Sequence, residues 1–427
     1  MEFNNILNLI KPTEEERNRI YSIINEFIKI LGFEGLEPFL GGSFAKDTWL
    51  RTDFDVDLFL LFENEKNMSD EIEKVLKKYN LNYERIKGSR DYFKVFYKGL
   101  EFEVVPVLKI KDPSEAKNST DLSIFHVKYI LEKIKEKPGI NDEIRLMKIF
   151  AKNIGVYGAE SYIRGFSGYA LELIVIYYGS FYNAIKNISY WKPKVIIDIE
   201  KYYNNFEEIK KVMSKDKIKS PIIIVDPTNK YRNVSASVSI EKFSEFIYYS
   251  KLFLKDNNKE KYFLNKIKID EEDIKNKSKI YEVSLIKLII EGKSNNRDIK
   301  NSKALRLFND ITRWLNFCGF YIFNRYMYFS ENKLYGYILV YPDKLPKYFL
   351  KKGPYVWSEN LEEFLSKHIN EEIIIKNGRV YSISPRKIIN LEDCISYILN
   401  SYKKSIEERA NYLNIEINNR VFEVKNE

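Results

Sequence analysis

The sequence predicts a multidomain protein of mixed α+β fold, and three observations carry this prediction. The chain has 427 residues, 44% of them hydrophobic, which is enough for several cores in two or three domains. The first part mixes helical with alternating apolar spacing, whereas helical spacing prevails from about Asp142 to Leu254. A Lys- and Asn-rich stretch at 255–279 precedes a third, mixed part. The expected domains are 1–140, 141–255 and 256–427.

The first part opens with a helix and continues with strands. Thr13 and Glu16 form a capping-box pattern, and isoleucines follow at helical spacing, so a helix is predicted over 13–31. The elements expected after it are a strand at 39–41, a helical turn at 44–48, a strand at 54–62, a helix at 69–79, and strands at 92–97 and 101–108. This part should therefore be built on a sheet.

Helices dominate the second part, and strands return in the third. The stretch at 255–279 resembles a solvated linker or a surface hairpin, and DPTNKYRN, which ends at Asn233, reads as a polar turn. Helical segments are expected around 142–153, 166–188, 239–254, 359–368 and 391–412, with strands at 334–341 and 372–376.

Composition favours a polyanionic partner. The chain carries 70 Lys and Arg against 61 Asp and Glu, a net charge of +9 that suits nucleic acid. Cys318 and Cys394 are too far apart for a metal-ligand pattern and too few for a disulfide framework, which fits a reducing cytoplasm. The longest charge-free apolar run, 173–185, is shorter than the ~18 residues of a spanning helix, so we expect no membrane contact.

An acidic strand is the first candidate for chemistry. In TDFDVDLFLLF, Asp53, Asp55 and Asp57 alternate with apolar residues and should share one face of a strand. Carboxylates held together repel one another unless a cation neutralises them, and Mg²⁺ is the natural cation because it prefers oxygen ligands. The alternative is an edge strand whose charges face water.

The turn before this strand adds a phosphate-binding pattern. Gly42-Ser43 leads into a helical turn, whose free N–H groups suit a phosphate, and Ser43 and Lys46 add a hydroxyl and a cation. A lone Gly-Ser is also an ordinary turn, but its pairing with two metal-ready carboxylates is what nucleotidyl transfer requires. A third carboxylate on the neighbouring strand is expected from Glu103, with Glu101 or a plain surface charge as alternatives.

These residues resemble the motif of the DNA polymerase β nucleotidyltransferase superfamily, in which Gly-Ser precedes an Asp-x-Asp pair and a later strand carboxylate. Within it, most of the chain resembles the archaeal class I CCA-adding enzymes. The stretches that carry this likeness are GSFAKDTWL, EVVPV, FHVKYI, GVYGAE, RGFSGY, VDPTNKYRNVSASVS and LPKYFLKKGPYVW. The resemblance implies a polymerase β-like catalytic head, a helical neck that selects the nucleotide, and an α+β C-terminal body and tail that bind tRNA.

The resemblance also implies residue roles. Asp55 and Asp57 match the carboxylates that hold two Mg²⁺ ions, and Ser43 matches a serine at the triphosphate. Lys46 stands where the family often has arginine. Glu103 stands where the family usually has aspartate, which makes its role in polarising the tRNA 3′-hydroxyl the least secure of the catalytic roles.

Four further residues resemble nucleotide-binding positions of the family. His126, Lys148 and Tyr157 match contacts to the triphosphate or ribose, and Arg232 matches the arginine that reads the incoming base. Each has a structural alternative: His126 as a packed, hydrogen-bonded side chain, for example, and Arg232 as a turn residue on a local carbonyl.

The implied activity is template-independent addition of CCA to tRNA 3′ ends. The 3′-hydroxyl attacks the α-phosphate of CTP or ATP in line, and pyrophosphate leaves. The implied partners are ATP, CTP and the acceptor and T arms of tRNA, and the sequence leaves a homodimer open. Alternatives are another RNA 3′-nucleotidyltransferase, such as a poly(A) polymerase or an oligoadenylate synthetase, and an inactive RNA-binding relative.

Overall fold

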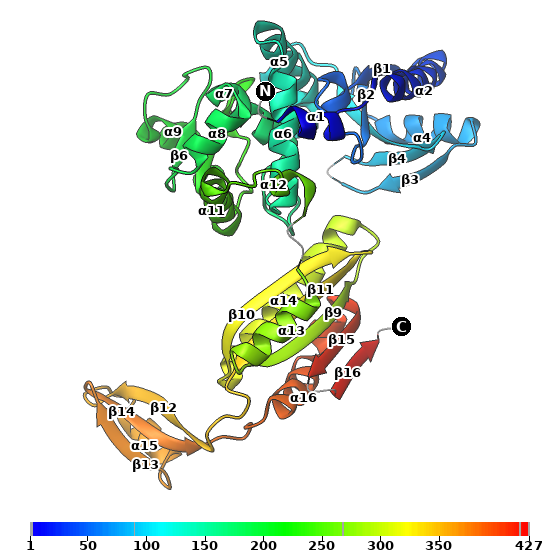
Figure 1. The fold of residues 1–427 in the computed structure, drawn as a ribbon. Coiled ribbons are helices and arrows are strands. Elements are labelled where there is room, and N and C mark those ends of the chain that lie inside the picture. Colours follow the sequence, from blue (N-terminus) through cyan, green and yellow to red (C-terminus); the bar gives the residue numbers. More distant parts are fainter. Residues whose placement is uncertain (1–2, 89, 267–268, 418–419, 426–427) are drawn as a thin grey trace. The chain divides into compact units, whose positions relative to one another are not determined.

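The computed structural model describes residues 3–88, 90–266, 269–417 and 420–425, and the chain divides into two compact units, 1–268 and 269–427 (Figure 1). Helices and strands are mixed in both units, so the α+β prediction is confirmed. The finer division at 140/141 and 255/256 stays a proposal.

The first unit begins with a five-stranded sheet of order β1-β2-β5-β4-β3, in which only the pair β2 and β5 is parallel. Helices α2 and α4 pack on one face against Val56, Leu58 and Val104, which leaves the alternate residues of β2 and β5 for the other face. The elements are α1 Asn4–Ile10, α2 Glu14–Phe33, β1 Glu37–Leu40, α3 Gly42–Ala45, β2 Val56–Phe62, α4 Met68–Lys78, β3 Asn82–Ile86, β4 Tyr92–Tyr97, β5 Leu100–Leu108 and α5 Ser123–Glu136.

Most predicted elements of this sheet are confirmed, with shifted ends. The capping box of Thr13 and Glu16 forms at the start of α2. The helical turn lies at Gly42–Ala45 rather than 44–48, and Gly42, its first residue, has a positive φ of +54°. The acidic strand begins at Val56 rather than Phe54. Strand β3 was not expected.

The rest of the first unit is mainly helical and includes a small sheet of order β6-β7-β8. The predicted helix at 166–188 is two helices, because Gly179, at φ +83°, ends the first and Ser180 caps the second. The predicted turn DPTNKYRN instead ends β7 and forms β8. The elements are α6 Ile140–Asn153, α7 Gly168–Tyr178, α8 Phe181–Ile188, β6 Val195–Ile197, α9 Phe206–Val212, α10 Lys215–Ile218, β7 Ile222–Asp226, β8 Asn229–Asn233, α11 Ile240–Lys255 and α12 Lys261–Leu264.

The Lys- and Asn-rich stretch is only partly solvated. Tyr262 and Phe263 of α12 are buried in the helical core beside Phe3 and Phe253. The expectation of a solvated linker is therefore wrong for these residues, because two adjacent aromatic side chains bury enough apolar surface to hold the segment on the first unit.

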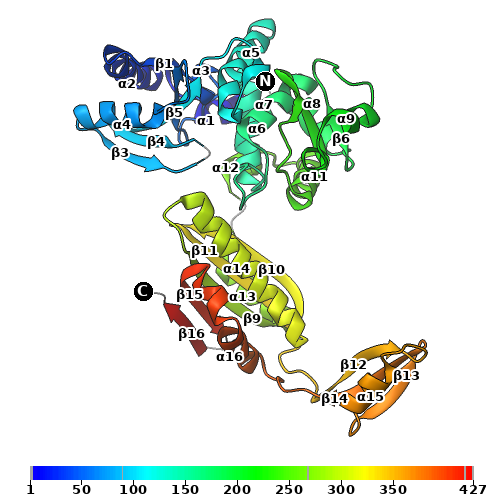
Figure 2. The same cartoon turned by 180° about the vertical axis from the view of Figure 1, so that it is seen from behind.

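The second unit has a five-stranded sheet of order β10-β11-β9-β15-β16 and a smaller one of order β12-β14-β13. Helices α14 and α16 cover one face of the larger sheet and α13 covers the other (Figures 1 and 2). The elements are α13 Glu271–Ile280, β9 Ser284–Gly292, α14 Arg297–Cys318, β10 Tyr321–Ser330, β11 Lys333–Tyr341, β12 Tyr348–Tyr355, α15 Leu361–Lys367, β13 Glu372–Lys376, β14 Arg379–Pro385, α16 Leu391–Ser401, α17 Lys403–Glu407, β15 Ala410–Ile417 and β16 Arg420–Lys425.

One predicted helix of this unit is wrong at its end. The helix expected at 391–412 is two helices, α16 and α17, of which the second ends at Glu407, and Ala410 begins β15, which pairs with both β9 and β16. The predicted helix therefore overlaps β15 only at 410–412, and the buried alternating residues Leu413, Ile415 and Ile417 that mark the strand lie just beyond it. In the described part of the chain, no helix has the length and apolar character needed to cross a membrane.

Candidate active site

Charged side chains form a row across the face of the first sheet that α2 and α4 leave free. Strand pairing sets Asp57 of β2 opposite Glu103 of β5, and Glu103 opposite Lys94 of β4. Asp55 lies two residues before Asp57, just ahead of the strand. The structure thus brings together the three predicted catalytic carboxylates and adds a lysine that sequence reasoning did not identify.

The Gly-Ser turn lies directly against this row. The N–H of Gly41 donates to the main-chain oxygen of Asp57 at 2.8 Å. A Cβ atom on Gly42 would lie 1.5 Å from Asp57 Oδ2, and the residue's φ of +54° also favours glycine. Only glycine at this position lets the turn, and Ser43 after it, approach the carboxylate.

The carboxylates raise one another's pKa. Partial burial raises the pKa of Asp57 to about 7, helped by the charges of Glu103 and Asp55 and opposed by Lys46 and Lys148. Burial also raises the pKa values of Asp55 and Glu103 above their ordinary range. A divalent cation would relieve this cost.

The donor set fits a hard divalent cation held by few protein ligands. Among the residues that the structure describes, no three acidic, histidine or cysteine side chains converge closely enough to bind one ion. Asp55 and Asp57 are nonetheless only two residues apart at the start of β2, and the charge of Asp55 contributes to the raised pKa of Asp57. Mg²⁺ is commonly bound by one or two carboxylates together with substrate phosphates. These two residues would hold the ion, with Glu103 as the third candidate.

Asp53 does not join the row, so the prediction that all three aspartates share one face is wrong. The strand begins only at Val56, and Asp53 lies in the preceding turn, where its carboxylate pairs with Lys152. Its side chain is 65% exposed. The structure therefore leaves Asp53 as a surface charge and Asp55 and Asp57 as the chemical pair.

A buried ion network lies next to the carboxylates. Glu172 of α7 is fully buried and accepts from Lys46 Nζ at 2.6 Å and Lys148 Nζ at 2.8 Å. The Thr48 hydroxyl donates to the same carboxylate at 3.0 Å. Burial lowers the pKa of Lys148 to about 8 against the pull of Glu172. Glu172 thus holds both predicted phosphate-binding lysines, and the sequence reasoning missed it.

Tyr157 lies at the edge of this network. A Cβ atom on Gly168 would lie 3.1 Å from the Tyr157 hydroxyl and 3.8 Å from Cε of Lys148. Burial, with the charge of Glu172 next, raises the pKa of Tyr157 above its ordinary value, so its hydroxyl stays protonated at neutral pH. Tyr157 and Lys148, predicted separately, therefore lie together.

The other two predicted nucleotide contacts meet at Asp226, which sequence reasoning also missed. Arg232 Nη1 donates to Asp226 Oδ2 at 2.6 Å, and His126 Nε2 lies 2.9 Å from the same oxygen. Burial lowers the pKa of His126, and Tyr169 stacks on its ring at 4.2 Å. The alternative of Arg232 as a turn residue on a local carbonyl is therefore wrong, because Arg232 lies on a strand and binds a carboxylate.

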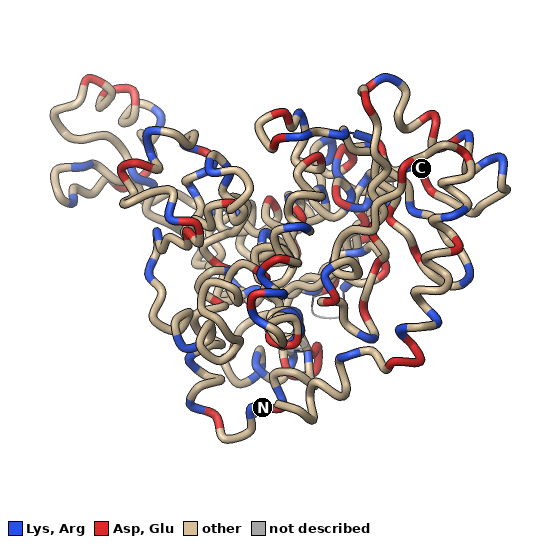
Figure 3. Tube along the Cα trace, turned by 90° about the horizontal axis from the view of Figure 1, so that it is seen from above, with Lys and Arg blue, Asp and Glu red and all other residues tan. Residues whose placement is uncertain are grey.

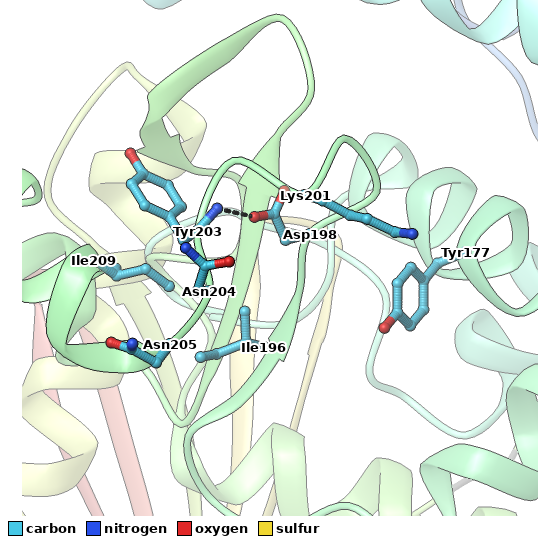
Figure 4. Close-up of a pocket in the computed structure, with 8 residues that line it drawn as sticks. All are labelled: Tyr177, Ile196, Asp198, Lys201, Tyr203, Asn204, Asn205 and Ile209. Carbon is cyan, nitrogen blue, oxygen red and sulfur yellow. Dashed lines mark hydrogen bonds between the residues drawn. The ribbon is translucent and has the colours of Figure 1, made fainter.

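A cavity of about 210 Å³ lies elsewhere in the first unit, and none of the predicted site residues lines it. Figure 4 shows Asp198 at its edge, accepting from the main-chain N–H of Tyr203 at 2.9 Å. The hydroxyls of Tyr202 and Tyr203 donate to the carbonyls of Pro227 and Lys230, each at 2.7 Å. The segment lining this cavity therefore supports the hairpin that carries Arg232.

Asparagine at position 57 is expected to stabilise the metal-free protein at high pH. Because the folded pKa of Asp57 lies above its unfolded value, the native state binds the extra proton, and this group's contribution falls as pH rises from about 4 to about 7. Without divalent ions, Asp57→Asn should therefore raise the free energy of unfolding at about pH 8 by roughly 1 kcal/mol, and the melting temperature with it. The gain should be smaller at about pH 5. Thermal unfolding in a chelator measures this.

The matched control for that measurement is Asp53→Asn, which removes the same charge from an exposed side chain outside the row. It should show no gain that grows with pH. A melting temperature of Asp57→Asn that follows wild type at every pH would contradict the raised pKa.

Comparisons with known proteins identify two domains in the first unit. Residues 21–126 match the family model described as a nucleotidyltransferase domain, and residues 142–264 match the tRNA nucleotidyltransferase second domain. A solved cytoplasmic RNA terminal U-transferase is 14% identical, with a TM-score of 0.50 over 62% of this chain and 97% of its own. At that identity the likeness concerns the fold, which is that of polymerase β-like nucleotidyltransferases.

Relatives along nearly the whole chain are more specific. The CCA-adding enzyme of Nanoarchaeum equitans is 40% identical over 377 residues, which cover 87% of this chain and 90% of the relative. The CCA-adding enzyme of Saccharolobus shibatae is 34% identical over 398 residues, 91% of this chain and 89% of the relative. With its acidic row, its Gly-Ser turn and both matching domains, the chain belongs to the family of archaeal CCA-adding enzymes, which are nucleotidyltransferases.

Proposed function

We propose that this chain adds C, C and A to the 3′ end of tRNA, using CTP and ATP without a nucleic-acid template. The observation that carries the proposal is the row of Asp57 and Glu103 directly beneath the Gly42-Ser43 turn, in a chain of this family. Nucleotidyltransferases generally use divalent metal ions, and we propose Mg²⁺ at Asp55 and Asp57, with Glu103 contributing to one of two ions. Bound there, the ions would activate the tRNA 3′-hydroxyl and neutralise the leaving pyrophosphate.

The chain's own residues orient the nucleotide. Gly42 and Ser43 lie where a triphosphate would meet the carboxylates. Lys46 and Lys148 supply positive charge, and Glu172 fixes both ammonium groups. Tyr157, protonated and next to Lys148, can donate to the triphosphate or the ribose. His126 and Arg232, which both contact Asp226, would position the sugar and the base of the nucleotide.

The second unit is proposed to bind the acceptor and T arms of tRNA by shape and phosphate contacts. Lys and Arg exceed Asp and Glu in the chain as a whole, and both signs are interspersed along the trace (Figure 3). The excess of basic residues suits a sequence-independent, salt-sensitive interaction with an RNA backbone. The two cysteines are free, which fits the cytoplasm.

The test is to incubate the protein with tRNA lacking its CCA end and each nucleoside triphosphate in turn. Gel electrophoresis of labelled tRNA follows the additions. We expect two additions with CTP alone, completion to CCA with CTP and ATP, and almost no addition with UTP or GTP. Repeated addition from ATP alone would identify a poly(A) polymerase-like enzyme instead. No addition with any nucleotide, while tRNA still binds, would identify an inactive RNA-binding relative.

A further inference from the structure

Lys94 is the cation within the charged row of the catalytic sheet. Its place opposite Glu103 in the register of β4 and β5 brings Nζ within 3.7 Å of Glu103 Oε1. The same ammonium pairs with Glu101. Lys94 therefore bridges the two carboxylates that the sequence offered as alternative third ligands.

The other nearby lysines are committed elsewhere. Lys46 and Lys148 both pair with Glu172, and Lys152 pairs with Asp53. Glu101 and Glu103 both form their ion pairs with Lys94. The Lys94 charge also opposes the rise in the pKa of Glu103 and of Asp55. Lys94 thus neutralises the part of the row that Glu172 and its lysines do not reach.

We propose that Lys94 is a built-in counter-ion that positions Glu103 in the metal-free protein and competes with the divalent ion for that carboxylate. The inference rests on the metal site of the proposed function. Glutamate at 103, longer by one methylene than aspartate, suits this role because its carboxylate can turn toward Lys94 or toward Asp57. The arrangement agrees with the finding that no three acidic groups converge on one point among the described residues.

Removing the Lys94 charge is expected to tighten metal binding. Lys94→Met should lower the dissociation constant for Mn²⁺ by about tenfold, because one positive charge no longer competes for Glu103 at close range. Lys94→Arg keeps the charge and should bind within about twofold of wild type. In Glu101→Gln, Glu103 is the remaining ion-pair partner of Lys94, so Mn²⁺ binding should weaken. Titration followed by the electron paramagnetic resonance signal of free Mn²⁺, without nucleotide, measures all of these.

Lys98→Met is the matched control, since it removes the same charge from the turn after β4. Lys98 pairs with Glu26 at 2.6 Å and, within the described part of the chain, forms no ion pair with a catalytic carboxylate. Its Mn²⁺ affinity should match wild type, and thermal unfolding should show that every variant folds. An unchanged affinity in Lys94→Met, or an equal gain in Lys98→Met, would overturn the role of Lys94.

A further variant separates this inference from the proposed function. Asp57→Asn should lose the Mn²⁺ site whatever Lys94 does. Wild-type protein that binds no Mn²⁺, or Asp57→Asn that binds it normally, would overturn the proposed metal site and the inference with it. Wild-type binding that Asp57→Asn abolishes and Lys94→Met leaves unchanged would refute the role of Lys94 alone.

Discussion

Asp55→Asn and Asp57→Asn are each expected to reduce nucleotide addition by roughly a hundredfold or more, while tRNA affinity stays near wild type. Loss of a metal ligand removes several kcal/mol of transition-state stabilisation, and about 1.4 kcal/mol corresponds to tenfold in rate. Binding should persist because these carboxylates are proposed to bind metal, whereas the phosphate contacts of tRNA are proposed to lie in the second unit. Single-turnover rates at saturating Mg²⁺ and filter binding of tRNA measure the two effects.

Asp53→Asn is the control within the same stretch. Its side chain is 65% exposed and pairs with Lys152 outside the row, so its addition rate should stay within about twofold of wild type. Without metal, Asp57→Asn is expected to be more stable than wild type. If it is, unfolding cannot explain a loss of activity in that variant. Near-normal turnover by either site variant would contradict the metal-ligand assignment.

Local signals of the sequence predicted much of the fold. The capping box of α2 formed as expected, and β4 at 92–97 and β13 at 372–376 have the predicted bounds, because alternating or helical spacing was clear there. Predictions failed where a helix is followed closely by a strand, as at 408–412 between α17 and β15, and where one residue breaks an apolar run, as Gly179 does between α7 and α8.

The candidate site was predicted only in part, because its partners are distant in sequence. Lys46 and Glu172 are 126 positions apart, and His126 and Asp226 are 100 apart. One signal was available: Glu172 interrupts the apolar helix YALELIVIYY, and a charge buried there requires a partner. Lys94 carried no such signal, since its role depends on the register of β4 against β5.

Arg232→Ala is expected to lower kcat/KM for CTP and ATP by about 5- to 150-fold, which corresponds to roughly 1–3 kcal/mol, and to change UTP misincorporation little. Cytosine and adenine present a ring-nitrogen acceptor at the pairing edge, where uracil and guanine present a donor. A guanidinium fixed in place can therefore favour both correct bases.

The structure supplies the fixing group. Asp226 Oδ2 accepts from Nη1 of Arg232 at 2.6 Å, and the Asp226 carboxylate is itself buried and bonded to the N–H of Thr228. The Arg232 side chain is 30% exposed, so part of its fork of donors can reach a ligand. The matched control is Lys230→Ala, which removes a charge from the same strand, where the Lys230 ammonium lies over the Tyr231 ring. It should leave kcat/KM for all three nucleotides unchanged.

A purely structural role for Arg232 predicts a different pattern. Leaving Asp226 without its arginine partner would then destabilise the hairpin of β7 and β8, and the loss would be equal for CTP, ATP and UTP, with a lower melting temperature. Base reading instead predicts a selective loss, because an incorrect base gains nothing from the guanidinium and so loses nothing when it is removed. Measuring kcat/KM for the three nucleotides beside thermal unfolding separates these outcomes, and an equal fall for all three would refute base selection by Arg232.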